Sequence, residues 1–184
     1  MFYLTKLYNI IYTFTATSLF IFVYLVKEHI CIDLPKFSDN LDFLASILIY
    51  ILAILYFAGF CILLQRLNSN KDNLGSIKEI EYADNSFLAN YLGFFFVALS
   101  LPKWGCFYDN IANIVIYAII FLFTLFSHSA YYNPVFLILG FKFYNAKNQD
   151  DVKILLITKR NLKKLSDWND VPLHRINNYT FIEV

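Results

Sequence analysis

Catalytic signatures are absent from this sequence. Its three histidines lie far apart, and none is spaced from another histidine or from a glutamate as in a metalloprotease helix. The three cysteines lack the spacing of a zinc site, and the sequence contains neither a serine-hydrolase motif nor a phosphate-binding loop. These absences predict a protein that is not an enzyme and that needs no metal or cofactor.

Charge is also scarce, at 16% of residues against 59% hydrophobic and 20% aromatic residues. The charged residues avoid four long stretches and gather between them, which is typical of a membrane protein rather than of a soluble domain. Because these stretches contain no Asp, Glu, Lys or Arg, the sequence argues against an ion-coupled transporter, which places ionisable groups near the bilayer midplane. The net charge of +1 gives no indication of nucleic-acid binding, and we expect no direct contact with nucleic acid.

The four apolar stretches predict an all-α transmembrane domain over residues 1–133, since about 20 apolar residues cross a bilayer core of about 30 Å. The predicted helices cover residues 7–26, 43–64, 85–101 and 110–130. Pro102 is expected to end the third helix, and Asn133-Pro134 forces the chain out of helical geometry after the fourth. The first stretch lacks the short apolar region and cleavage site of a signal peptide, so we expect it to remain as an anchor.

Basic residues predict the orientation of these spans. With both termini inside, the cytoplasmic face holds Lys6, Arg66, Lys71, Lys78 and the eight Lys and Arg residues after Gly140. The outer face then holds only Lys27, Lys36 and Lys103. Since basic flanks are retained in the cytoplasm, the sequence predicts a multi-pass protein with both termini cytoplasmic.

Residues 134–184 predict a small cytoplasmic β-rich domain, built either as a hairpin-based sheet or as an SH3-like barrel. Residues 141–144 alternate in polarity, and residues 152–158 form a β-branched run after a polar turn, which together indicate a hairpin. A second pair, 171–176 and 179–184, is separated by Asn177-Asn178, a dipeptide that tolerates the positive φ of a tight turn.

A fifth strand is predicted outside this tail. Residues 77–82 (IKEIEY) lie on the same side of the membrane and alternate in polarity, so they are suited to join the sheet. Ser76 and Glu79 alternatively form a capping box that would open a helix here. The alternation favours the strand.

The two predicted outer loops hold candidate residues for disulfide formation and for sensing. Cys31 and Cys106 fall one in each loop, so an oxidising compartment would allow them to pair, although two separate thiols are equally consistent with the sequence. Trp104, Phe107 and Tyr108 gather in the loop 102–110. These rings form either an aromatic belt at the membrane surface or a loop that senses disturbance of the outer leaflet.

Four basic residues on the cytoplasmic side are a candidate partner-binding site: Lys159, Arg160, Lys163 and Lys164. Near the inner leaflet they would attract anionic lipid at about 1 kcal/mol each, and the alternative is a docking patch for an acidic partner.

Polar and small residues within the spans predict helix packing. Asn90 and Asn113 are expected to hydrogen-bond between helices rather than to bind a substrate. Ala89 with Gly93, and Thr13 with Thr17, have the small-residue spacing that lets helices approach closely. We therefore expect a homo-oligomer in the lipid bilayer, for which a tetramer is one candidate.

Three segments carry a resemblance to a known family. ADNSFLANYLGFFFVALS at positions 83–100, NPVFLILGFKFY at 133–144 and ILLITKR at 154–160, together with the four-span layout, resemble the membrane subunit of the Kiwa antiphage defence system, KwaA. The resemblance implies a bacterial inner-membrane homo-oligomer that detects phage attack at the envelope and associates with a cytoplasmic DNA-binding effector subunit, KwaB. It implies no catalytic residues.

These observations together predict a non-enzymatic membrane sensor and scaffold whose basic tail docks that effector. The alternative is an oligomeric channel or membrane-permeabilising effector, which the lack of charge inside the spans and the small-residue faces also favour.

Overall fold

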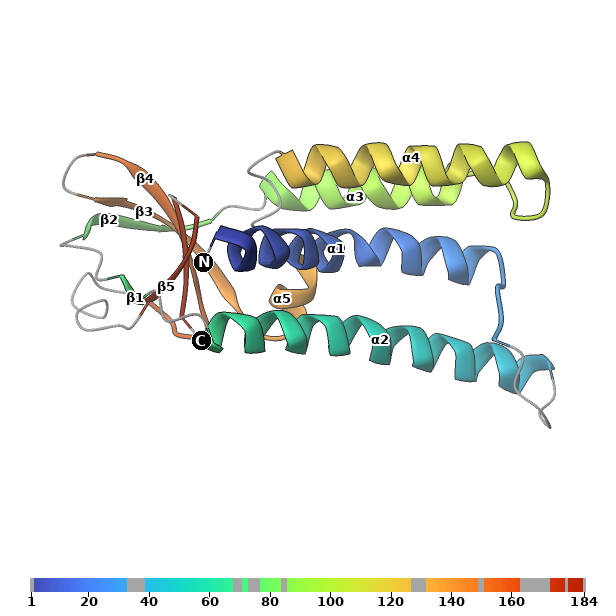
Figure 1. The fold of residues 1–184 in the computed structure, drawn as a ribbon, viewed down its shortest axis with the longest axis horizontal. Helices are drawn as coiled ribbons and strands as arrows, with labels where there is room; N and C mark the ends of the chain where they lie inside the picture. The colour runs from blue at the N-terminus through green and yellow to red at the C-terminus, as the bar shows by residue number, and fades with distance from the viewer. Residues whose placement is uncertain are drawn as a thin grey trace.

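The structure is a computed structural model that describes residues 2–32, 39–67, 71–72, 77–83, 86–126, 132–148, 151–162, 173–177 and 179–183. Four helices lie side by side, and a sheet covers one end of them (Figure 1). The helices are α1 (Phe2–Lys27), α2 (Asp39–Leu67), α3 (Ser86–Ser100) and α4 (Phe107–Phe126). Both termini lie at the sheet end, as four antiparallel helices require (Figure 1).

In the described part of the chain, three helices are long and apolar enough to cross a membrane: Leu7–Lys27, Leu41–Arg66 and Phe107–Phe126. The predicted span 85–101 is the exception, because α3 has only 15 residues and is therefore about 22 Å long at 1.5 Å per residue. Pro102 follows its end, where a residue without an N–H cannot continue the helix. The bounds predicted for this helix agree with α3 to within one residue at each end, but in the described residues the four predicted spans become three candidate spans and one shorter apolar helix.

The other helix bounds also differ from those predicted. α1 and α2 extend beyond 7–26 and 43–64, since hydropathy marks only the apolar part of a helix and not its polar ends. The helix predicted for 110–130 begins at Phe107, because the Cys106 carbonyl already accepts a hydrogen bond from the Asn110 N–H at 2.9 Å. Residues 127–130 lie outside the described residues.

Helix α1 is the centre of the helical part and contacts α2, α3 and α4. Five side chains four residues apart are buried on one face of it: Tyr8, Tyr12, Ala16, Phe20 and Tyr24. Beside them, Thr13 and Thr17 bury their hydroxyls by donating to the carbonyls of Asn9 at 2.7 Å and Thr13 at 3.0 Å. This hydrogen bonding within α1 lets the threonine side chains lie between helices. Gly93 of α3, which was also predicted to allow close helix packing, is exposed instead.

A short helix, α5 (Pro134–Ile138), joins the helical part to the sheet. Asn133 caps it by accepting a hydrogen bond from the Val135 N–H at 2.9 Å, and Pro134 occupies the first position, where a missing N–H costs nothing. At the other end, Gly140 has φ +85, and the N–H groups of Gly140 and Phe141 close back onto Leu137 and Phe136. A glycine in this left-handed conformation is the usual way to end a helix.

The sheet has six strands: β1 (Lys71–Asp72), β2 (Ile77–Tyr82), β3 (Lys142–Asn148), β4 (Lys153–Thr158), β5 (Leu173–Asn177) and β6 (Thr180–Ile182). Their order is β1-β5-β6-β4-β3-β2, antiparallel except for the parallel pair β4 and β6. The predicted hairpin, the second antiparallel pair and the strand at 77–82 are confirmed. The SH3-like barrel is not, since the described strands form an open sheet with β1 and β2 at its edges.

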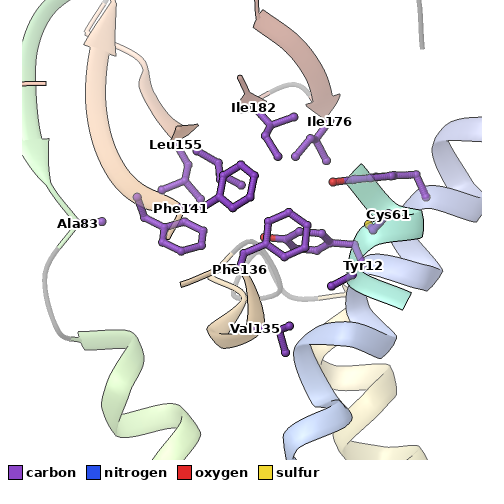
Figure 2. Packing of buried hydrophobic residues seen from close by; sticks show 13 residues of the cluster. Tyr12, Cys61, Ala83, Val135, Phe136, Phe141, Leu155, Ile176 and Ile182 are labelled. Carbon is purple, nitrogen blue, oxygen red and sulfur yellow. The ribbon is translucent and has the colours of Figure 1, made fainter. Parts of the chain in front are cut away.

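One buried cluster joins the helices to the inner face of the sheet (Figure 2). Tyr12 of α1, Cys61 of α2 and Phe136 of α5 meet Phe141 and Ile182 from the sheet side. Alternate residues of β4 face a second cluster on the other side of the sheet, so this strand is covered on both faces. The helix ends and the sheet are therefore packed as one body.

Phe136 is the side chain that we expect to matter most at this junction, because it is fully buried among residues of α1, α5 and the sheet. Phe136→Ala should lower the free energy of unfolding by roughly 3–5 kcal/mol. Ile138→Ala in the same helix is the matched control, since Ile138 is 71% exposed and should change stability by less than about 1 kcal/mol. Denaturant unfolding in detergent measures both, and equal losses would contradict this assignment of the core.

Candidate functional site

A pocket of about 430 Å³ lies between α1 and α4, at the end of the helices away from the sheet. Its lining is apolar except for a few hydroxyl and amide groups, and it includes Phe20 and Tyr24 of α1, Leu101 and Trp104 of the α3–α4 connection, and Asn113 and Tyr117 of α4. Concave apolar pockets with a few convergent polar groups are where proteins most often bind ligands. The pocket is therefore the candidate site.

A hydrogen-bonded group forms the polar wall of this pocket. The Tyr24 hydroxyl donates to the Pro102 carbonyl at 3.0 Å, and Asn113 Nδ2 donates to the Tyr24 hydroxyl at 2.7 Å and to the Pro102 carbonyl at 3.1 Å. Deeper along the helices, the hydroxyls of Thr17 and Tyr117 lie 3.1 Å apart and share a hydrogen bond. These contacts fix α1, α4 and the α3–α4 connection relative to one another.

Charged residues hold the same connection from outside. Lys27 Nζ donates to the Leu101 carbonyl at 2.6 Å, which satisfies a carbonyl just beyond the end of α3. Lys27 also pairs with Glu28 at 3.1 Å, and Glu28 Oε2 accepts from the Trp104 N–H at 3.3 Å. The hydrogen bond from Lys27, followed by that from the Trp104 backbone, lowers the pKa of Glu28.

The structure separates the three aromatic residues of the predicted sensing loop. Trp104 lies in the connection and lines the pocket. Phe107 and Tyr108 instead form the first turn of α4 and are 71% and 79% exposed. Asp109 in that turn suits the positive end of the helix dipole, and the Asn110 side chain accepts a hydrogen bond from the Gly105 N–H at 3.0 Å. The helix therefore starts inside the segment that was predicted to be loop.

The remaining candidates of the outer end and of the spans lie as follows. Cys31 and Cys106 are exposed free thiols in the described part of the chain, and their pairing stays a prediction. Asn113 is buried and hydrogen-bonded between α4 and α1. Asn90 lies in α3, and its side chain is outside the described residues.

The basic candidates lie at the end of the sheet nearest the helices. Thr158 pairs in register with Lys142, which follows α5, so the residues after β4 are close to the helix ends. Lys159 Nζ lies 4.8 Å from the centre of the Phe141 ring, and Arg160 Nε pairs with Glu183 at 2.6 Å. Lys163 and Lys164 lie outside the described residues. In the described part of the predicted cluster, Lys159 therefore lies against an aromatic ring, and Arg160 is already paired with a carboxylate.

The sequence analysis did not identify two residues that join helices to one another. Asn133 was interpreted only as part of a helix-breaking dipeptide, but it is fully buried and donates to Thr15 Oγ1 at 2.7 Å. The Asn-Pro order was the available signal, since it is the pattern of a helix cap followed by its first residue. Tyr24 had no polar neighbour in sequence to mark it, and only the position of α4 reveals its role.

Comparison with known proteins gives one family. A family model described as anti-phage protein KwaA matches residues 8–182 of the chain. No curated protein and no solved structure matches. The matched range includes all the residues named above for the pocket and for the basic edge of the sheet.

Acid should release Trp104 from Glu28. Because the pKa of Glu28 is lowered in the folded protein, the stabilisation by its carboxylate is present above the usual glutamate pKa and is lost as the pH falls through the lowered value. The chain has two tryptophans, so Trp168→Phe leaves Trp104 as the only fluorophore of this kind. Its emission should shift below the usual glutamate pKa, and Glu28→Gln should remove that transition. An unchanged transition in the Gln variant would refute the link.

Proposed function

The chain belongs to the KwaA family of anti-phage proteins, and we propose that it is a non-enzymatic membrane sensor and scaffold of a bacterial antiphage defence complex. In this proposal the helices lie in the inner membrane with both termini in the cytoplasm, and the protein forms a homo-oligomer. The sheet docks a cytoplasmic DNA-binding effector subunit of the KwaB type. The helices receive the signal, and the sheet passes it on.

The observation that carries this proposal is the shared core of the helices and the sheet (Figure 2). Tyr8 and Tyr12 of α1 are buried in the same cluster as Ile176 and Ile182 of the sheet. Closely packed interiors transmit displacement rather than absorb it. A shift of α1 within the membrane would therefore move the sheet, which is what a sensor joined to a docking domain needs.

The distribution of basic residues supports the orientation. At the sheet end, Arg66, Lys159 and Arg160 are exposed beside the helix ends. At the opposite end, Lys27 is occupied by the Leu101 carbonyl and by Glu28. Lys103 is also exposed at that opposite end, and Arg160 is paired with Glu183. Exposed basic residues are still more numerous on the sheet side, as expected for the cytoplasmic face.

Lys159 is the described residue best suited to contact an acidic partner surface. It is exposed, and among the described residues its ammonium group contacts the ring of Phe141 rather than a carboxylate. Arg160, in contrast, is paired with Glu183 at the end of β6, so changing it would also disturb the sheet. Deleting the whole tail would expose the shared core, which makes single charge reversals the sharper test.

We expect Lys159→Glu to weaken capture of the effector by the detergent-solubilised protein roughly three- to tenfold, because one attractive charge becomes repulsive. Lys153→Glu is the matched control, since Lys153 is also exposed and begins β4, whereas Lys159 follows the other end of that strand. Capture is measured by pull-down at two salt concentrations, with the bound protein identified by mass spectrometry. Phage protection in cells should fall with Lys159→Glu alone.

Two results would count against this proposal. Equal capture by both variants would remove Lys159 from the docking surface. If the purified protein binds no partner and conducts ions across liposomes by itself, the oligomeric channel becomes the better account, because a scaffold has no activity without its effector.

A further inference from the structure

Strand β2 lies at the edge of the sheet, and its outer side has no partner among the described strands (Figure 1). On its inner side, the Ala83 N–H donates to the Phe143 carbonyl at 2.9 Å. In an antiparallel pair, positions that bond to the neighbouring strand alternate with positions whose backbone groups point away from it. The register of β2 with β3 is regular from Glu79 to Tyr82. The N–H and C=O groups of Ile80 and Tyr82 therefore point to the open edge.

The features that usually protect an edge strand are confined to the first half of β2. Natural proteins close such edges with charges and with β-bulges. Here the bulge lies between Ile77 and Glu79. Lys78 pairs with Asp151 at 2.9 Å and Glu79 pairs with Lys147, so both charges are held by the β3–β4 hairpin. The second half of the strand has no bulge and keeps its edge open.

The side chains of this second half are accessible. Tyr82 is 56% exposed, and its ring lies edge-on to Tyr144 with the centroids 5.3 Å apart. Glu81 is exposed on the other face of the strand, and no salt bridge reaches it among the described residues. The open backbone groups are thus flanked by one aromatic ring and by one unpaired carboxylate.

A second copy of β2 fits this edge poorly. Antiparallel pairing about Ile80 would place Glu79 opposite Glu81, and pairing about Glu81 would place two Glu81 side chains opposite each other. Like charges directly opposite each other are destabilising. Pairing about Tyr82 would engage only the end of the strand. The edge therefore suits an extended segment of a different protein, with a positive charge where β2 has a negative one.

We propose that the open edge of β2 binds an extended segment of a cytoplasmic partner, which adds a strand to the sheet and places a lysine or arginine opposite Glu81. Backbone hydrogen bonds to Ile80 and Tyr82 supply the affinity, and the charge pair sets the register. The proposal rests on the proposed function, because the partner is the effector that the sheet docks. Strand β3 separates β2 from β4, so this contact is distinct from the one at Lys159.

The first test removes one backbone donor from the edge. Tyr82→Pro and Tyr82→Ala lose the same ring contact, but only the proline variant lacks the outward N–H. Proline is tolerated on an edge strand when its N–H would face solvent. In the pull-down used for Lys159→Glu, the Pro variant should capture the effector at least about tenfold more weakly than the Ala variant. Equal capture by two variants with the same thermal unfolding would overturn the role of the edge.

The second test changes the charge and leaves the backbone intact. Glu81→Gln should weaken capture roughly three- to tenfold at low salt and make it less sensitive to salt, because one attractive charge is lost. Glu79→Gln is the matched control on the same face of β2, since Glu79 is already paired with Lys147, and its capture should stay within about twofold of the wild type. Equal losses, or no loss in either variant, would overturn the assignment of Glu81.

The remaining outcomes separate this inference from the proposed function. If the wild-type protein captures no effector, both fail. Normal capture by all the β2 variants, beside a loss in Lys159→Glu, overturns the inference alone. A changed oligomeric state in Tyr82→Pro with unchanged capture would assign the edge to a second copy of the chain and would equally overturn its assignment to a partner.

Discussion

The buried amide of Asn133 determines how the chain passes from helix to sheet. Its oxygen caps α5 and its nitrogen donates to Thr15 of α1, so one side chain both starts a helix and attaches it to the central span. An amide buried at a helix junction avoids the cost of an unmade hydrogen bond when both of its ends are paired. With α5 fixed in this way, Phe136 enters the shared core and Gly140 turns the chain into β3. This contact fixes α5 against α1, and the shared core then holds the sheet against the helix ends.

Much of the fold was predictable because its signals are local. Hydropathy located the helices, and alternation located the strands, including residues 77–82 far from the tail. The bounds of α3 were predicted at 85–101 and observed at Ser86–Ser100, because Pro102 marks the end of this helix in the sequence. The parallel pairing of β4 with β6 was hidden, since it joins residues separated by the whole segment that includes β5.

The candidate site was likewise predictable only in part. The sequence singled out Trp104 and Asn113 separately, one as a surface aromatic and one as an interhelical amide. That both line one pocket depends on the rotation of α4 against α1, which is set by the Tyr24 and Tyr117 hydroxyls. A tyrosine in an apolar stretch gives no sign in sequence of which helix its hydroxyl will reach. The pairing of Arg160 with Glu183 was hidden for the same reason.

The position of β6 between β5 and β4 has a consequence for biosynthesis. A chain made from its N-terminus delivers α1 to the membrane first and residues 180–182 after all the other strands. Tyr8 and Ile182 nevertheless belong to one cluster. The packing around the start of α1 is therefore completed only when β6 joins the two halves of the sheet. The shared core is thus complete only after β6 has been made, and a chain that stopped before β6 would leave the part of α1 that packs near Ile182 without this cover.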